Sequence, residues 1–373
     1  MRAGIAVRWI VYPLFLTSAI LAGYGDPDPD YPTHPDWQER TVLTLVNLCR
    51  MSPEQFRDDY LQVSGILLPQ NYPAVDPVYW NLNLNRIARI HAQDMAENCG
   101  LQHNSCDGTP FGSRVGGFYQ GRGIAENIAY GYGSPFQTVA SWILDGRSDN
   151  PAPDGASPSQ QWPSGDGHRR NIMGEHYGEA GAGFALGSQG RRDENPYWVI
   201  NFGSNQTTSD SKIPAGTHIV AEDQATIFMA NYFSADERSA LDAVVVVDGV
   251  EYPLETVVGR QWRGTYSTQV DAGAECRRYF FRFTDSGGQQ HRYPEEGAFA
   301  TYGEGGCEQQ YLEPSHIRTE PVGVGPVMRD RISQPVHAYD VSGRRVRARG
   351  RFSGGLLIVE QHGRRSVRVE LGD

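Results

Sequence analysis

Residues 165–185 read GDGHRRNIMGEHYGEAGAGFA, and this stretch decides the fold of the first half of the chain. It places His168 in a Gly-His-Arg-Arg segment and follows it with an E-x-G-x-G run that begins at Glu179. Four further stretches lie in order around it: CGLQHNSCDGTPFGSR (99–114), GIAENIAYG (123–131), SWILDG (141–146) and YWVINFG (197–203). The candidate functional side chains of the chain are gathered in these stretches.

Two histidines and a glutamate in these stretches, His103, Glu126 and His168, can carry chemistry. Neutral imidazole nitrogens and carboxylate oxygens are normal zinc ligands, so the set is compatible with a divalent metal site. The same groups can act as general acid and general base. Buried histidine and glutamate side chains also tie loops together by hydrogen bonds. The residues alone therefore leave three roles open: metal binding, catalysis and structure.

In order and spacing, the five stretches resemble the CAP superfamily of cysteine-rich secretory, antigen 5 and pathogenesis-related proteins, and most of all its bacterial branch. The H-x-S segment of that pattern corresponds to His103-Asn104-Ser105, and the E-N-I-A segment to Glu126–Ala129. The G-H-R-x-N-I-M segment corresponds to Gly167–Met173, and E-x-G-x-G to Glu179–Gly183. The resemblance covers about residues 37–205.

This resemblance implies both a fold and a site. The fold is an α-β-α sandwich over residues 37–205, in which His103, Glu126 and His168 meet in a shallow cleft. The family pattern has a second glutamate on the helix before the Gly-His segment, where this chain has the shorter carboxylate of Asp145. A zinc site would then consist of all four of these side chains.

The resemblance also bears on function, because it implies lipid, sterol or peptide ligands and no settled reaction. We therefore expect a binding protein, and the sequence does not decide whether it is also an enzyme. Two alternatives remain: a metal-dependent extracellular hydrolase that acts through His103, Glu126 and His168, and a non-enzymatic adhesion or structural module at the cell surface.

The N-terminus predicts export from the cell. Two arginines precede an apolar run from Trp9 to Gly23. At about 15 residues this run is shorter than the roughly 20 that a membrane span needs, which favours a secretory signal peptide. We predict the signal peptide at residues 1–25, with an uncleaved anchor helix as the alternative, and a Pro-Asp linker at 26–36. The protein is thus expected to be secreted or at the cell surface, with no membrane span in the mature chain.

The five cysteines fit an oxidising compartment. Cys99 and Cys106 lie close together around a predicted turn, and Cys276 and Cys307 lie in a strand-rich region, so each pair could form a disulfide. Cys49 falls on an apolar helix face, where we expect a buried and unreactive thiol.

Beyond residue 205 the sequence becomes one of short strands. After a polar linker at 206–217, β-branched or alternating runs are separated by turn signals, which is typical of a β-sandwich. The predicted strands are Thr226–Asn231, Ala243–Val247, Tyr252–Val258, Thr265–Val270, Tyr279–Thr284 and Ala298–Tyr302. We predict an immunoglobulin-like sandwich at 218–312, in which DSGG (285–288) forms a hairpin turn rather than a serine-protease nucleophile segment.

A second linker, at 313–334, leads to a small C-terminal β-module at 335–373. Its segment YDVSGRRV (339–346) resembles the sorting modules of type IX-secreted bacterial proteins and the related flagellar-hook-cap immunoglobulin-like fold. Leucine stands where the second motif of that pattern has tyrosine, after Gly355. A simple surface-attached β-module is the alternative.

The net charge of −11 argues against a nucleic-acid partner. The C-terminal module alone departs from this balance, since eight arginines against four carboxylates make residues 335–373 net positive. The predicted fold class is therefore α+β: an α-β-α CAP domain, then an immunoglobulin-like β-sandwich, then a small β tail. The predicted partners are a lipid, sterol, peptide or other cell-surface component.

Overall fold

The computed structural model describes residues 35–121, 123–145, 166–187, 196–205, 211–220, 226–271, 277–295 and 298–301, together with the backbone of four short strands between 338 and 369. The predicted signal peptide at 1–25 and the second linker at 313–334 lie outside the described residues. No helix among the described residues is long and apolar enough to span a membrane.

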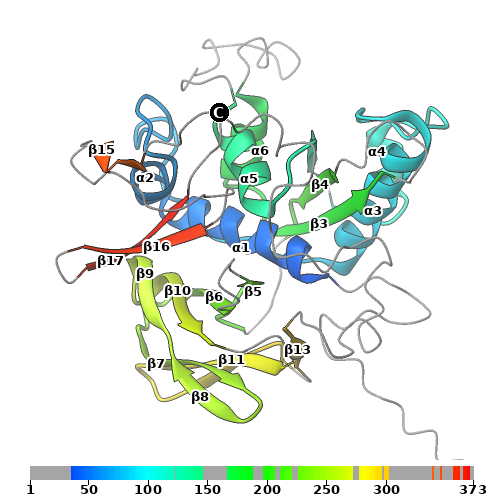
Figure 1. Cartoon of the computed structure of the whole chain (residues 1–373). Helices are drawn as coiled ribbons and strands as arrows, with labels where there is room; N and C mark the ends of the chain where they lie inside the picture. The colour runs from blue at the N-terminus through cyan, green and yellow to red at the C-terminus, as the bar shows by residue number, and fades with distance from the viewer. Residues whose placement is uncertain are drawn as a thin grey trace, which may run out of the picture.

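The first half of the chain alternates helices with four strands (Figure 1). The helices are α1 (Trp37–Met51), α2 (Pro53–Gln55), η1 (Phe56–Leu61), α3 (Leu82–Asp94), η2 (Met95–Cys99), α4 (Phe111–Gly116), α5 (Pro135–Ile143) and α6 (Gly167–Met173). The strands are β1 (Tyr79–Trp80), β2 (Ile124–Tyr130), β3 (Glu179–Leu186) and β4 (Pro196–Gly203). They form one sheet in the order β1-β3-β4-β2, in which only β1 runs parallel to its neighbour.

Helices cover both faces of this sheet. On one face α3 buries Ala88 and Ala92 against Val199 of β4, and on the other α1 and α5 share a core with Ile200 and Phe202 of the same strand. Alternate residues of one strand thus serve opposite faces, as the pleat requires. The layers are helix, sheet and helix, in agreement with the predicted order.

The glycines of the E-x-G-x-G motif allow α3 to approach the sheet. A Cβ atom on Gly183 would lie 2.2 Å from the backbone nitrogen of Arg89, and one on Gly181 would lie 1.9 Å from that of Asn85. Real Cβ contacts are never this short, so only glycine fits where the helix backbone crosses the strand. The motif is therefore a packing device and lies away from the cleft.

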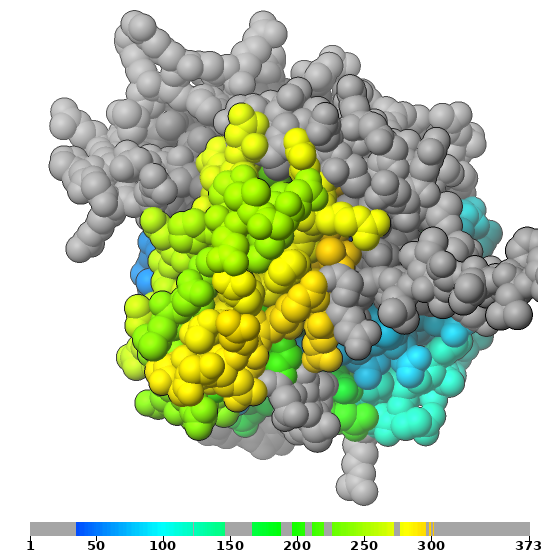
Figure 2. Space-filling view, turned by 90° about the horizontal axis from the view of Figure 1, so that it is seen from below, coloured from blue at the N-terminus to red at the C-terminus, as the bar shows by residue number. Residues whose placement is uncertain are grey.

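The second half contains two antiparallel sheets that face each other (Figure 1), and its green-to-orange surface is seen from below in Figure 2. One sheet has the order β5-β6-β10-β9, and the other has the order β12-β11-β7-β8 with β13 paired to β11. Their strands are β5 (Gly216–Val220), β6 (Thr226–Phe233), β7 (Ala240–Val247), β8 (Val250–Pro253), β9 (Glu255–Arg260), β10 (Arg263–Val270), β11 (Arg278–Asp285), β12 (Gln290–Tyr293) and β13 (Phe299–Ala300). Aromatic rings join the two sheets, with centroids 5.2 Å apart for Tyr232 and Phe283 and 4.9 Å for Phe228 and Tyr279. This half is a β-sandwich.

Two predictions for this half differ from the structure. The strand predicted at Tyr252–Val258 is two strands in different sheets, divided at the buried Leu254. The predicted linker at 206–217 ends earlier than expected, because Ile213 and Ala215 are buried and β5 already begins at Gly216. Ile213 and Ala215 are apolar residues in an otherwise polar segment of the sequence, and their burial packs this segment against the sandwich.

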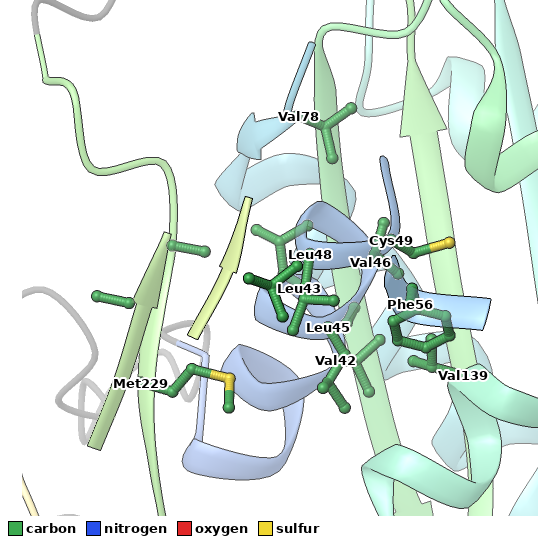
Figure 3. Close-up of a cluster of buried hydrophobic side chains, with 14 of the residues drawn as sticks. Val42, Leu43, Leu45, Val46, Leu48, Cys49, Phe56, Val78, Val139 and Met229 are labelled. Carbon is green, nitrogen blue, oxygen red and sulfur yellow. The ribbon is translucent and has the colours of Figure 1, made fainter. Parts of the chain in front are cut away.

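Helix α1 lies between the two halves and is buried on all sides (Figure 3). Its apolar face packs in the first half, while its other face contacts strands β5, β6 and β10 of the sandwich. There the Oγ1 atoms of Thr41 and Thr217 lie 2.8 Å apart, and Asn231 Nδ2 donates to the carbonyl oxygen of Thr44 at 3.2 Å. Met229 of β6 completes the contact, and the two halves share one hydrophobic core.

The ends of α1 are set by local capping. Asp36 and Glu39 form a capping box, in which each side chain accepts a hydrogen bond from the backbone N–H of the other. The helix ends at Met51 because Pro53 cannot continue it. Asp36, predicted as the last linker residue, is thus the N-cap of the helix.

Four strands are described in the C-terminal module, and they form two hairpins. They are β14 (Ala338–Tyr339), β15 (Arg345–Val346), β16 (Leu356–Gln361) and β17 (Arg364–Val369). β14 pairs with β15 and β16 with β17, both antiparallel. Both hairpins lie within the segment predicted as the C-terminal module.

Candidate functional site

The first half of the site is a pair formed by His103 and Glu126. Glu126 projects from β2, and His103 lies in the loop after η2, which the Cys99–Cys106 disulfide closes. His103 Nδ1 lies 3.0 Å from Glu126 Oε1. The His103 side chain is 54% exposed and the Glu126 side chain only 1%, so the imidazole lies above a buried carboxylate.

An arginine completes this half of the site. Arg114 of α4 donates from Nη2 to Glu126 Oε2 at 2.5 Å and from Nη1 to the carbonyl oxygen of His103 at 2.8 Å. Its side chain is only 5% exposed. Both oxygens of Glu126 are therefore engaged within the protein.

The second half of the site is a pair formed by His168 and Asp145. Asp145 follows the end of α5, and His168 lies in the first turn of α6. Asp145 Oδ2 lies 3.1 Å from His168 Nδ1 and accepts the backbone N–H of His168 at 3.0 Å. Arg169, which is fully buried, donates to the backbone oxygens of Ile143 and Asp145 and so fixes the chain before the pair.

The two pairs lie close enough to influence each other. Burial lowers the pKa of His168, Asp145 opposes this shift, and the positive charge of a protonated His103 adds to it. Asn171 Nδ2 donates to Asn127 Oδ1 at 2.9 Å, and Asn127 Nδ2 donates to the carbonyl oxygen of His168 at 3.0 Å. These bonds fasten α6 to β2 and hold the second pair beside the first.

Residues 45–202 match the family model described as the cysteine-rich secretory protein family, CAP. These residues form a CAP domain. The match extends from α1 to β4 and contains all four members of the two pairs. The family predicted from the ordered motifs is confirmed for this part of the chain.

Solved structures and curated proteins add little to this match. The chain is similar to an outer surface protein from Borrelia burgdorferi, at 15% identity and a TM-score of 0.29, over 46% of this chain and 97% of that one. No curated protein matches the chain.

The four side chains predicted as zinc ligands do not form one cluster in the CAP domain. They form two separate pairs, and within the described residues no three His, Cys, Asp or Glu side chains are grouped as a metal site would require. In each pair the carboxylate contacts Nδ1 of the imidazole, which leaves Nε2 as the atom that can reach a ligand. His103, Glu126, Asp145 and His168 are thus arranged as two imidazoles, each paired with one carboxylate.

Sequence reasoning missed two residues of this site, Arg114 and Arg169. Both are buried arginines that bond to backbone oxygens, and Arg114 also bonds to Glu126. The chain has 33 lysine and arginine residues, so nothing in composition singles these two out. Their only signal is position: Arg114 ends the quoted 99–114 stretch, and Arg169 is the arginine of the Gly167–Met173 motif.

Other candidates are structural. His91 is buried in α3 and bonds through Nε2 to the carbonyl oxygen of Gln102, while Glu175 and His176 are exposed on a loop. Glu179 accepts hydrogen bonds from Asn81 and Tyr119.

The cysteines and the DSGG segment can be placed in the same way. The Cys99–Cys106 disulfide is present, and Cys49 is a buried free thiol, both as predicted. Cys276 and Cys307 lie outside the described residues. The DSGG segment turns the β11–β12 hairpin, and its Asp285 accepts the backbone N–H of Gly287, as expected for a turn.

Proposed function

We propose that the protein is an exported CAP-domain binding protein and that its ligand binds at the outer nitrogens of His103 and His168. One observation carries this proposal: two imidazoles are each held at Nδ1 by a less exposed carboxylate, and Asn127, next to Glu126, bonds to the carbonyl oxygen of His168. The exposed fractions of the two imidazoles are 54% and 35%, against 1% and 23% for the carboxylates. A carboxylate at Nδ1 directs Nε2 outward, so the pairs present two oriented nitrogens to whatever occupies the cleft.

Export is supported by two features. The predicted signal peptide at residues 1–25 stands before the CAP domain, and Cys99 and Cys106 form a disulfide, which is rare in a reducing compartment. We infer that the protein acts outside the cytoplasm, secreted or at the cell surface.

We further propose that the second half of the chain is immunoglobulin-like. With β5 taken as strand A, the order β5-β6-β10-β9 corresponds to A-B-E-D, and β12-β11-β7-β8 corresponds to G-F-C-C′. This order supports the assignment. The proposed organisation is then a CAP domain from about residue 37 to 205, an immunoglobulin-like sandwich, and a separate C-terminal module that serves in sorting or surface attachment.

The donor set of the cleft fits a zinc ion held by two imidazoles. His103 and His168 would bind it through Nε2, while Glu126 and Asp145 hold the opposite nitrogens, an arrangement that supports metal-bound histidines generally. Bound zinc would supply a Lewis acid able to attract an anionic or carbonyl oxygen of the ligand. We place lipid, sterol or peptide ligands there because of the resemblance to CAP proteins.

The test measures zinc and ligand binding by the full chain. At a zinc concentration 100 times Kd, linkage predicts a stabilisation of about 2.7 kcal/mol, or a rise of about 3–4 °C in Tm for the full chain. His103→Ala and His168→Ala should each remove most of the shift. The matched control is His176→Ala, because His176 is an exposed histidine outside both pairs.

The same variants are then compared for binding to phosphatidylcholine–cholesterol vesicles and to a peptide library. Binding that is lost in His103→Ala and His168→Ala, but not in His176→Ala, supports the proposed site. Equal binding and equal zinc shifts in all four proteins would show that the cleft histidines have a structural role only.

A further inference from the structure

Arg114 contacts both members of the first pair, and this distinguishes it from every other cation near the cleft that the structure describes. Its Nη2 atom donates to Glu126 Oε2 and its Nη1 atom donates to the carbonyl oxygen of His103. A third contact, from Nη1 to Ser105 Oγ at 3.4 Å, holds the guanidinium against the loop. Arg114 is thus fixed in place by three partners.

The charge of Arg114 is permanent and poorly screened. A guanidinium keeps its proton at any accessible pH, and a side chain that is 5% exposed is shielded little by salt or water. Glu126, with its side chain 1% exposed, forms an ion pair with this guanidinium. A divalent ion that approached Glu126 would have to displace, or be repelled by, a cation already in contact with it.

The second pair is built differently. Asp145 is 23% exposed, and its carboxylate contacts the side chain and the backbone N–H of His168. The neighbouring Arg169 donates to the backbone oxygen of Asp145. The first pair thus has a guanidinium bonded to its carboxylate, and in the second pair the adjacent arginine bonds to the backbone of Asp145.

We propose that Arg114 is an internal cation that occupies the side of Glu126 where a metal ion would bind, so that Glu126 orients His103 and is not a metal ligand. This inference rests on the proposed zinc site at His103 and His168. It makes Arg114 a positioning residue that lowers the affinity of the cleft for divalent ions. It also explains why the two pairs stay separate instead of closing into one cluster.

The experiment measures Zn²⁺ affinity by calorimetry in a double-mutant cycle of the full chain at pH 7.5. Arg114→Met removes the charge but keeps the length of the side chain, and Glu126 is then free to bind the ion. We expect Arg114→Met to bind Zn²⁺ about tenfold or more tightly than wild type, and Arg114→Met/Glu126→Gln to lose that gain. Arg86→Met is the matched control, because Arg86 stacks on Phe118 on the outside of α3.

A second readout is the absorption spectrum of bound Co²⁺, which reports the number and geometry of its ligands. The spectrum should change in Arg114→Met and return toward that of wild type in the double variant. A merely structural ion pair predicts a lower Tm in Arg114→Met with no gain in affinity. Unchanged or weaker Zn²⁺ binding in folded Arg114→Met would therefore overturn the inference.

If Arg114→Met does not fold, Glu126→Gln in the wild-type background decides the question. Here the inference predicts a loss of Zn²⁺ affinity of no more than about 10–100-fold, which is typical of a residue that only orients a metal-binding histidine, whereas the loss of a direct ligand would cost more than that. The proposed function fails separately, because it requires wild type to bind Zn²⁺ at all. If wild type does not bind Zn²⁺ but Arg114→Met does, the proposed function is refuted and the inference about Arg114 is supported.

Discussion

Replacing Met229 with alanine should destabilise both halves of the protein together. Met229 lies on β6 of the sandwich, is fully buried, and points toward α1 of the CAP domain (Figure 3). Truncation of a buried methionine costs about 2–5 kcal/mol, depending on how far the site can collapse. Because Met229 is held between a helix and a sheet, both fixed by further contacts, we expect about 3 kcal/mol. That corresponds to a fall in Tm of about 4 °C, because the entropy of unfolding grows with chain length.

Scanning calorimetry of the full chain measures the shift and also the number of transitions. Since α1 belongs to the cores of both halves, we expect a single transition that moves as a whole. Leu241→Ala on the same sandwich is the control, because Leu241 is 71% exposed and its truncation should change stability by less than about 0.5 kcal/mol. Two separate transitions, with only the second half destabilised in Met229→Ala, would refute the shared core.

Other substitutions test the packing of α3, a buried histidine and the disulfide. Gly183→Ala should prevent α3 from approaching the sheet and abolish cooperative unfolding as seen by circular dichroism, because its Cβ would overlap the helix backbone. Burial, with Arg40 nearby, holds the pKa of His218 well below 6.5, so the folded state keeps this histidine neutral where the unfolded chain binds a proton. Stability should therefore fall as the pH drops below about 6.5, and denaturant titrations of His218→Gln at pH 5 and 7.5 should show a smaller fall than wild type. Cys99→Ser/Cys106→Ser opens a short loop and should cost roughly 2–3 kcal/mol by the same titration, while a cost near zero would mean that the loop is ordered without the disulfide.

The sequence was sufficient to predict the CAP domain because the residues of its motifs are required by the packing of the fold. Gly181 and Gly183 admit a helix backbone, and His103 and His168 stand at fixed places in ordered segments. By contrast, the roles of Arg114 and Arg169 depend on burial. The sequence does not distinguish a buried arginine that bonds to backbone oxygens from an arginine on the surface, and only the folded structure shows which is which.

The contact between the halves was also beyond sequence reasoning. The apolar positions of α1 predict one buried face, but its second face carries Thr41 and Thr44, which periodicity treats as exposed to solvent. These residues are buried because their polar atoms find partners on the sandwich, at Thr217 and Asn231. The sequence also did not predict that the strand at Tyr252–Val258 is divided at Leu254. Leu254 is buried and apolar, so it continues the strand pattern in the sequence, although the chain passes from one sheet to the other at this residue.

The two-sided burial of α1 also constrains the order in which the protein can fold. Thr41 and its partner Thr217 are 176 residues apart, and a ribosome adds roughly 5–20 residues each second. For roughly 10–35 s during synthesis, the second face of α1 has nothing to cover it. A nascent CAP domain would thus present a helix face that only the later sandwich can satisfy, which makes this helix the expected binding point for any factor that keeps the growing chain from aggregating.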